Sequence, residues 1–386
     1  MNILILYWGK KGGGARYTLE VARSLKKQTG VKTYLSISTY CEIFEEFTSL
    51  SIPIHVVKTY RSVFGFSYKF LIGKYLIKKG FERYLKENQI DTVIIGMDFF
   101  WSEVIYNACK KAGAKTIYVV HEPKPHPNEP AIMSFIKERT LRNAIRGADH
   151  VVTLTEHVSR FVQNKYGVPT GCVSVIPHGI FSYYSAPAHK KINGDVENLV
   201  LLFFGRIEYY KGLDILLKAF RLLRNSGFKI KLEIWGSGDL SDYECLLSNT
   251  DNIRIENRWI SEDEIPTIFK RAHLCILPYR DASQSGIVGI ANDAAIPIIA
   301  CPSEGLREQL IGAGALLSDD FTPESLANVI EKVITDREKY EELSKKAIDY
   351  SSKLRWPSIA HSFKRLGEDL QNSNLGSGES MLPQKN

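Results

Sequence analysis

Residues 199–212 read LVLLFFGRIEYYKG, a short apolar run that ends at a glycine and leads into a polar loop. The six residues before Gly205 are continuously apolar, as in a strand that is buried on both faces of a parallel sheet. From Gly212 onward the apolar side chains recur with helical spacing over 212–226. The stretch therefore predicts a strand, a loop and a helix, which together form half of a βαβ unit.

The same alternation of apolar runs and amphipathic stretches extends along the chain in both directions. It predicts an α/β protein with parallel sheets, because crossover helices join parallel strands. Strands are expected at residues 2–7, 32–37, 53–57, 91–96, 115–120, 150–154, 173–176, 199–204, 229–235, 252–255, 273–277 and 296–300. Helices are expected at residues 15–29, 102–112, 212–226, 262–271, 286–294, 305–311, 323–334, 336–353 and 357–370.

The length of 386 residues suits two domains, each with its own core. A polar stretch with Gly and Asn marks the expected linker between them. We predict two Rossmann-like, doubly wound domains that face each other across a cleft, with ligands at the carboxyl ends of the strands. The expected parts are domains at 1–184 and 199–356, a linker at 185–198, a C-terminal crossover helix at 357–370 and a disordered tail at 371–386.

Cysteines and apolar runs narrow the function classes. The six cysteines lie far apart and form no C-x-x-C pair, so we expect buried reduced thiols and neither a zinc site nor a disulfide framework. The first residues lack the basic leader of a secretory signal, and no apolar run approaches the roughly 20 residues that span a bilayer. We therefore expect a cytoplasmic protein.

Two loops of the first domain could bind a ligand. The glycine-rich loop at 8–14 opens a helix, where backbone N–H groups favour an anion. It does not fit G-x-G-x-x-G, and the strand at 32–37 ends without an acidic residue, which argues against a dinucleotide oxidoreductase. The alternative is a glycine turn without a ligand.

The second of these loops, HEPKPHP at 121–127, follows a strand and is stiffened by prolines. His121 and Glu122 could bind sugar hydroxyls or transfer protons. Proline excludes the helix that an H-E-x-x-H zinc site needs. The alternative is a rigid turn whose histidine has a structural role.

Two loops of the second domain suit an anion. Arg206 and Lys211 lie five residues apart just before a helix and could hold a diphosphate, or else be solvated surface cations. Residues 280–286 read RDASQSG and lead into a helix, where serine hydroxyls and amides favour an anion. Ser285 as a plain N-cap is the alternative.

These motifs together resemble the retaining nucleotide-sugar glycosyltransferases of the GT-B fold, of the group-1 or family-4 type. The resemblance covers the chain from residue 1 to about residue 370. It rests on GRIEYYKG at 205–212, WGSG at 235–238, RWISEDEIP at 258–266 and SQSG to AIPIIA at 283–300. HEPKPHPNE at 121–129 looks closest to a subgroup that assembles exopolysaccharide, capsule or O-antigen.

The resemblance implies a nucleotide-sugar donor in the second domain and a polysaccharide or lipid-linked acceptor on the side of the first. Arg206 and Lys211 would hold the donor diphosphate, and His121 would lie against the transferred sugar. Donor-binding residues would be Gly13, Gly14, Gly205, Gly236, Trp259, Ile260, Ser283, Ser285 and Gly286, and Glu122, Glu156, His178 and Gly179 would line the cleft. Retention is usually explained in this family by front-face displacement, which fits a chain with no convincing nucleophilic carboxylate pair. No metal or other cofactor is expected.

One departure from the family concerns two glutamates, eight positions apart, that flank the sugar and the ribose. Ser283 and Ala291 stand at these positions. Alanine cannot accept a hydrogen bond from a ribose hydroxyl, so the ribose is held otherwise, the donor is unusual, or activity is lost. We favour a working variant. The alternatives are a non-catalytic relative that acts as a partner subunit, a nucleotide-sugar epimerase and a phosphorylase.

Residues 58–86 combine many basic side chains with interleaved aromatic ones, and Glu82 is their one acid. Such a stretch suits anionic lipid and the headgroup boundary. We expect a peripheral contact with the inner face of the plasma membrane, where a lipid-linked acceptor would be met. The alternative is a helix whose aromatic side chains enter the core while its lysines are solvated. No nucleic-acid-binding pattern is present, so no such partner is expected.

Overall fold

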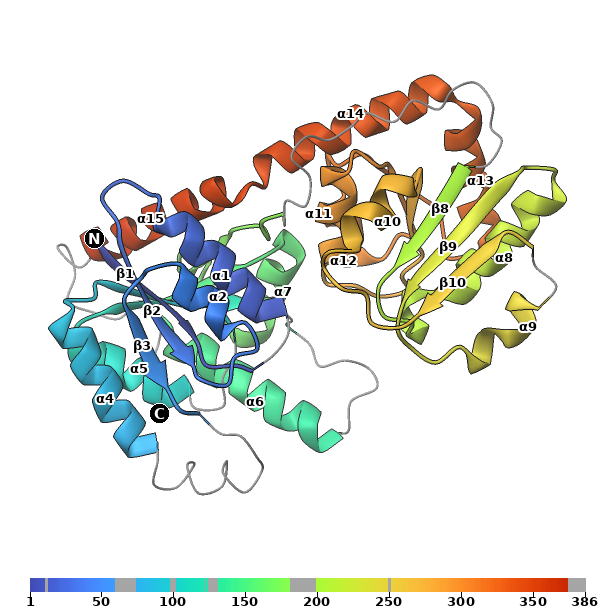
Figure 1. The fold of residues 1–386 in the computed structure, drawn as a ribbon. Coiled ribbons are helices and arrows are strands. Elements are labelled where there is room, and N and C mark those ends of the chain that lie inside the picture. Colours follow the sequence, from blue (N-terminus) through green and yellow to red (C-terminus); the bar gives the residue numbers. More distant parts are fainter. Residues whose placement is uncertain are drawn as a thin grey trace. The chain divides into compact units, whose positions relative to one another are not determined.

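The computed structural model describes residues 1–10, 13–59, 74–97, 102–121, 123, 131–180, 199–248 and 251–373. The chain divides into two compact units, unit 1 with Met1–His178 and Trp356–Asn386 and unit 2 with Gly179–Arg355 (Figure 1). The predicted linker 185–198 lies outside the described residues, so a boundary at 184 stays a prediction.

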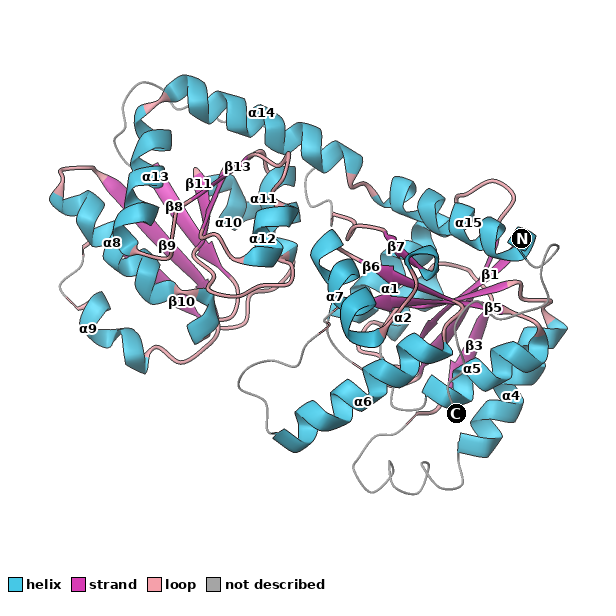
Figure 2. Cartoon of the chain, turned by 180° about the vertical axis from the view of Figure 1, so that it is seen from behind, coloured by secondary structure: helices cyan, strands magenta, loops and turns pink. Residues whose placement is uncertain are grey.

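Unit 1 is built on a parallel sheet in the order β3-β2-β1-β4-β5-β6-β7 (Figure 2). The strands are β1 Asn2–Tyr7, β2 Lys32–Ser38, β3 Ile54–Val57, β4 Thr92–Ile95, β5 Lys115–Val120, β6 His150–Thr153 and β7 Val173–Val175. The central strands are buried on both faces, which explains their continuously apolar sequences.

Helices cover both faces of this sheet (Figure 1). They are α1 Gly13–Leu25, α2 Phe44–Ser49, α4 Lys74–Glu87, α5 Ser102–Ala112, α6 Ala131–Gly147, α7 Glu156–Tyr166, the short η2 Thr170–Cys172 and α15 Trp356–Asn372. Side chains of α4, α5, α6 and α7 share one core with alternate residues of the central strands. The returning helix α15 packs beside α1.

Unit 2 repeats this plan with a parallel sheet in the order β10-β9-β8-β11-β12-β13. Its strands are β8 Leu199–Phe204, β9 Ile230–Gly236, β10 Ile253–Asn257, β11 Leu274–Leu277, β12 Ile298–Ala300 and β13 Ala315–Leu317. Its helices are η3 Tyr209–Lys211, α8 Leu213–Asn225, η4 Ser241–Tyr243, α9 Glu244–Leu247, α10 Ile265–Arg271, α11 Gly286–Asp293, α12 Glu304–Gln309, α13 Pro323–Thr335 and α14 Arg337–Lys353.

Both sheets have the doubly wound order, in which the first strand is central and the chain then turns to the other side. The strand order therefore reverses between β1 and β4 in unit 1 and between β8 and β11 in unit 2. Ligands of such sheets bind at the carboxyl ends of the strands near this reversal. A ligand of unit 2 is therefore expected at the loops that follow β8 and β11.

Several sequence predictions differ from the structure, among them the helix expected at 262–271, which begins at Ile265 as α10. The helix expected at 15–29 spans Gly13–Leu25, because the glycine run closes directly into the helix and polar residues follow Leu25. Helix α15 continues to Asn372, two residues into the predicted tail. Strand β13 was not predicted, since its three apolar residues directly follow a glycine. Cys245 is exposed, whereas the other five cysteines are buried free thiols as expected.

No helix among the described residues is long and apolar enough to cross a membrane. No group of three or more His, Cys, Asp or Glu side chains in the described ranges is placed to hold a metal ion.

Candidate functional site

The loop between β8 and α8 begins and ends with glycines in backbone conformations that L side chains rarely adopt. Gly205 has φ of +123° and Gly212 has φ of +67°. A Cβ at Gly212 would overlap the carbonyl oxygen of Pro278, just after β11. Glycine is therefore needed here because the loop packs against the neighbouring strand's backbone at the strand-order reversal.

Arg206 and Lys211 lie in this loop. The Arg206 side chain is 56% exposed, and its Nη1 lies 2.9 Å from Oε1 of Glu208. Lys211 Nζ lies 3.7 Å from the centroid of the buried Tyr279 ring and 5.1 Å from that of Tyr210. The rings attract and orient the ammonium group without neutralising it. An incoming diphosphate would compete with Glu208 for Arg206 and meet the positive charge of Lys211.

A second ion pair joins the first turn of α8 to the loop after β11. Arg280 donates two hydrogen bonds to Asp214, of 2.8 and 2.7 Å, and a third of 3.0 Å to the carbonyl oxygen of Tyr209. Burial acts to raise the pKa of Asp214, but the bonds and charge of Arg280 outweigh it and hold that pKa below its ordinary value. Sequence reasoning missed this pair, because its members lie 66 positions apart.

Residues 283–286 form the end of the loop after β11. Ser285 occupies the N-cap position of α11, but its side chain makes no capping hydrogen bond. Its N–H instead donates to Oε1 of Gln309 at 2.8 Å, and Gln309 Nε2 donates back to the Ser285 carbonyl at 2.9 Å. The plain N-cap interpretation is therefore wrong. Gly286 is exposed and Ser283 half-buried, so the partially positive start of α11 remains accessible.

Ala291 lies inside α11 and is completely buried in the apolar core of unit 2. Its methyl group offers no hydrogen bond to a ribose. Ser283 lies on the accessible loop, so the two positions of the family's glutamate pair have opposite environments.

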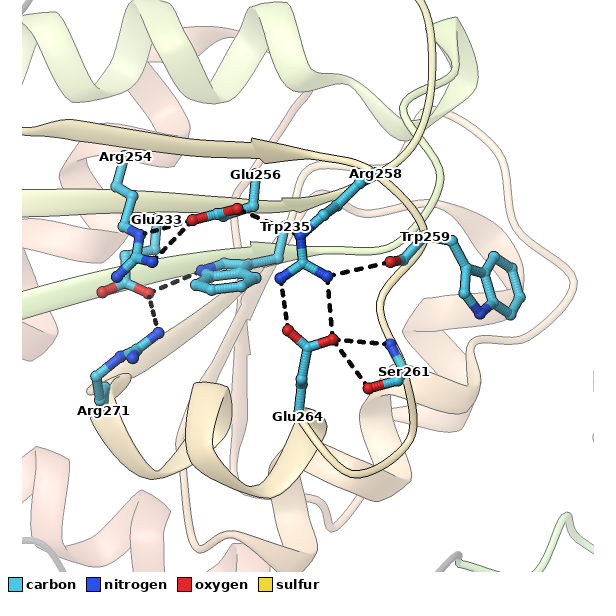
Figure 3. Close-up of polar contacts among 9 residues, drawn as sticks. All are labelled: Glu233, Trp235, Arg254, Glu256, Arg258, Trp259, Ser261, Glu264 and Arg271. Atoms are coloured by element: carbon cyan, nitrogen blue, oxygen red, sulfur yellow. Dashed lines mark hydrogen bonds and ion pairs between the residues drawn. The ribbon is translucent and has the colours of Figure 1, made fainter.

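The loops after β9 and β10 complete this edge of the sheet. A Cβ at Gly236, whose φ is +147°, would overlap the carbonyl oxygen of Gly205. Beyond β10, the Trp259 side chain is 81% exposed and Ile260 is half-buried. A network of arginine and glutamate side chains surrounds this segment (Figure 3). The predicted donor-binding residues of unit 2 are thus all at the carboxyl ends of its strands or on the loops that follow them.

His121 follows β5 in unit 1 and has a defined protonation state. Its Nε2 lies 2.8 Å from the carbonyl oxygen of Gly96, so this nitrogen carries the proton and donates it. Burial, and then the nearby His178, lower the pKa of His121 to about 4, although the bond to Gly96 acts in the opposite direction. The ring is neutral at pH 7, and its Nδ1 can accept a hydrogen bond.

A cluster of rings surrounds His121. Tyr17 of α1 lies edge-on to it at 4.7 Å between centroids, and the ring of His178 lies at 6.4 Å. Trp356, the first residue of α15, contacts both Tyr17 and His178. The structure therefore brings the predicted residues His121 and His178 together through a tyrosine that sequence reasoning did not single out.

The other predicted residues near the first sheet are more scattered. Gly14 is buried, and a Cβ there would overlap the side chain of Met97, while Gly13 is exposed with open space around it. Glu156 is exposed in the first turn of α7. Gly179 is buried and belongs to unit 2. Glu122 lies outside the described residues.

Two known protein families match the two halves of the chain. The family described as Glycosyltransferase Family 4 matches residues 11–181, and the family described as Glycosyl transferases group 1 matches residues 186–350. The two matches together take in most of both units. The chain belongs to the group 1 glycosyltransferases.

Individual relatives of the chain are distant. Lipopolysaccharide 1,2-N-acetylglucosaminetransferase of Salmonella typhimurium is 24% identical over 55% of the chain and 60% of its own length. D-inositol 3-phosphate glycosyltransferase of Thermobifida fusca is 26% identical over 55% of the chain and 53% of its own length. The chain thus spans little more than half the length of these relatives.

A solved structure agrees over almost the whole chain. Alr3699/HepE of Anabaena in complex with UDP has a TM-score of 0.73 at 17% identity, with 96% of this chain and 100% of that one covered. This likeness confirms the predicted α/β, GT-B class of fold with two Rossmann-like domains.

Proposed function

We propose that this glycosyltransferase moves a sugar from a nucleotide-sugar donor onto a polysaccharide or a lipid-linked saccharide, with retention of anomeric configuration. The observation that carries the proposal is the loop Gly205–Gly212, which sets two cations at the carboxyl edge of the second sheet. The Anabaena structure with this fold is a complex with UDP, which supports a nucleotide-linked donor.

In this proposal Arg206 and Lys211 act mainly by electrostatics. The bond between C1 of the sugar and the diphosphate oxygen breaks, the acceptor oxygen forms the new bond on the same face, and its proton passes to a leaving phosphate oxygen. Negative charge then accumulates on the departing nucleoside diphosphate. Cations positioned beforehand stabilise that charge without reorganising during the reaction.

His121 would orient the transferred sugar. Because its Nε2–H is committed to Gly96, only Nδ1 is left, and a neutral Nδ1 is an acceptor for a sugar hydroxyl. His121 would therefore bind the donor as a hydrogen-bond acceptor, and it would carry no charge at pH 7.

The acceptor side includes the proposed membrane contact, and here the structure corrects part of the sequence interpretation. Phe81 of α4 is completely buried and Tyr84 packs against the same core, so these two aromatic residues cannot face lipid. Lys86 and Arg83 form ion pairs with Glu82 and Glu87.

What supports a lipid contact on the described part of α4 is narrower. Leu76 is 68% exposed, Lys79 is exposed and Lys78 is half-buried. Residues 60–73 of the stretch lie outside the described residues. We keep the proposal of a peripheral contact with an anionic membrane at the inner face of the plasma membrane, in a protein that works in the cytoplasm.

The proposed pathway is assembly of a bacterial surface polysaccharide such as exopolysaccharide, capsule or O-antigen. The Salmonella relative is named for lipopolysaccharide, which is consistent with a surface saccharide. No metal or other cofactor is proposed.

The test begins with a thermal-shift screen of nucleotide sugars, since a bound donor raises the melting temperature by mass action. The stabilising donor is then incubated with oligosaccharide and lipid-linked acceptors, with and without EDTA, and the product anomer is assigned by NMR. Conversion of the donor sugar without acceptor would indicate an epimerase. Binding without turnover under any of these conditions would indicate a non-catalytic partner subunit.

A further inference from the structure

Residues 259–261, after β10, belong to neither a strand nor a helix. Hydrogen bonds from side chains hold this segment in place. The carbonyl oxygen of Trp259 accepts a 3.2 Å hydrogen bond from Nη1 of Arg258. The N–H and hydroxyl of Ser261 donate to Oε2 of Glu264 at 3.1 and 2.9 Å. Arg258 and Glu264 bind each other through two hydrogen bonds of 3.0 and 2.5 Å. The pair thus ties both ends of residues 259–261 together (Figure 3).

Arg258 is itself oriented from the sheet. Its Nε lies 3.3 Å from Oε2 of Glu256 on β10, and its guanidinium carbon lies 5.8 Å from the ring centroid of Trp235 on β9. Trp235 is 4% exposed, and its Nε1 donates a 2.8 Å hydrogen bond to Glu233. The direction of the Arg258 guanidinium is therefore set by residues of two strands.

The charges of the pair are stable around neutral pH. The hydrogen bonds from Arg258, and then those from Ser261, lower the pKa of Glu264 to about 2. Glu264 in turn raises the pKa of Arg258 above its already high ordinary value. The tie is consequently present at any pH at which the enzyme would be assayed.

The tied segment presents a large aromatic side chain to solvent. Trp259 is 81% exposed, the highest fraction among the large hydrophobic residues that the structure describes as exposed. Neither the N–H nor the carbonyl of Ile260 takes part in the hydrogen bonds found between described residues. An exposed ring beside an unused donor and acceptor, on a segment held from both ends, suits a planar polar ligand.

We propose that the Arg258–Glu264 pair is a positioning device that holds residues 259–261 in the conformation that receives the base of the nucleotide donor. A segment ordered in advance binds more tightly, because it loses less conformational entropy on binding. This inference rests on the proposed function, since it requires a nucleotide at this edge of the sheet. The diphosphate is held elsewhere, by Arg206 and Lys211, so the pair acts on base recognition alone.

Arg254 provides a matched control. It also lies over the Trp235 ring, at 4.8 Å, and it donates to Oε1 of Glu256 at 2.8 Å. Within the described network it makes no hydrogen bond to Trp259, Ser261 or Glu264, as Figure 3 shows. Arg258→Ala and Arg254→Ala therefore remove the same kind of side chain from the same ring and carboxylate, and only the first releases the segment.

The experiment measures binding to the full chain by titration calorimetry, with UDP, GDP, ADP and inorganic diphosphate as probes. Arg258→Ala should weaken the binding of the preferred nucleoside diphosphate about tenfold, which is the size of effect expected when the hydrogen bonds that hold residues 259–261 are lost. Its affinity for inorganic diphosphate should stay at the wild-type value, and Arg254→Ala should bind all probes as wild type does. Glu264→Ala should repeat the Arg258→Ala effect, and the double variant should be no weaker than either single one.

Three results would overturn the inference while leaving the proposed function intact. They are wild-type nucleotide affinity in Arg258→Ala, an equal loss for Arg254→Ala and Arg258→Ala, and a loss that affects inorganic diphosphate as much as the nucleotide. A wild-type chain that binds none of the three nucleoside diphosphates would overturn the proposed function and this inference together.

Discussion

The carboxyl edges of the two sheets share a topology but differ in chemistry. In unit 2 the edge is charged. Arg206 and Lys211 lie on a loop whose glycines bring backbones together, and Arg280 of the loop after β11 pairs with Asp214 in the first turn of α8. In unit 1 the described side chains around His121 are the rings of Tyr17, His178 and Trp356, and His121 itself is neutral at pH 7, so we call this the neutral edge. A doubly wound sheet fixes where a ligand binds, and the side chains on its loops decide which part of a ligand suits each sheet. The charged edge suits a diphosphate, and the neutral one suits sugar hydroxyls.

The largest effect should come from removing the charge of the unit 2 edge. Arg206→Ala or Lys211→Ala should lower turnover at least about 10²-fold, because the leaving diphosphate loses a preorganised cation. Lys332→Ala, which removes a lysine from α13 instead, is the control and should leave the rate unchanged. Steady-state kinetics with the donor found by thermal shift measures the change. Wild-type rates in both site variants would remove the diphosphate assignment.

A substitution at the backbone contact between the loops of unit 2 should have the next largest effect, on the free energy of unfolding. Gly212→Ala places a side chain in a left-handed conformation and against the Pro278 carbonyl, so it should lower the free energy of unfolding by at least about 2 kcal/mol. Gly80→Ala in α4 is the matched control. A Cβ added at Gly80 would meet no atom within 4 Å, so this substitution should stabilise the chain by about 0.5–1 kcal/mol. Denaturant unfolding of both variants tests the pair, and a harmless Gly212→Ala would mean that the close contact is absent in solution.

The sequence predicted where the strands and loops of these edges lie, but not which of their side chains contact one another. The strands that end at them were placed within two residues, because buried parallel strands are continuously apolar and stop at polar or glycine residues. The loops were therefore located correctly. Gly30 and Gly113, which follow α1 and α5, have the left-handed backbone that favours glycine after a helix. Contacts between distant segments had no sequence signal. Arg280 and Asp214 lie 66 positions apart, and Tyr17 meets His121 only because α1 packs on the sheet that also carries β5. β13 was missed because its three apolar residues directly follow Gly314, whereas β7, an edge strand of the same length, lies in a longer run with alternating apolar residues.

The neutral edge of unit 1 should show itself in the pH dependence of stability. His121 has a folded pKa near 4 and an unfolded pKa near 6.5, so the unfolded chain binds more protons between these values and stability falls as pH decreases from 6.5 to 4. His121→Gln keeps a donor for Gly96 but cannot titrate. Since the ring is half-buried, this variant should recover on the order of 1–2 kcal/mol of the loss.

Unfolding by urea at pH 7.0 and 4.5 measures this difference. His55 and His150, whose pKa values burial also lowers to about 4, are present in both proteins and cancel in the comparison. Transfer by His121→Gln should be reduced at pH 7 while its affinity for free UDP stays unchanged. Parallel stability curves for the two proteins would show that His121 is not held neutral, and the contrast between the two edges would lose its basis.

The smallest expected effect concerns the lysines of α4 in unit 1. If α4 contacts anionic lipid, each basic residue near the surface contributes about 1 kcal/mol, and the binding weakens as salt shortens the Debye length. Lys78→Glu with Lys79→Glu reverses two charges and should reduce sedimentation with phosphatidylserine vesicles, whereas Lys345→Glu with Lys346→Glu on α14 of unit 2 should not. Transfer to a water-soluble acceptor should persist in both variants, because neither change touches the charged or the neutral edge. Equal sedimentation of both variants and the wild type would mean that the lysines of α4 form a solvated helix face. Phe81 and Tyr84 of the same helix already pack in the core and do not face lipid. A lipid-linked acceptor would then have to be argued from residues outside α4.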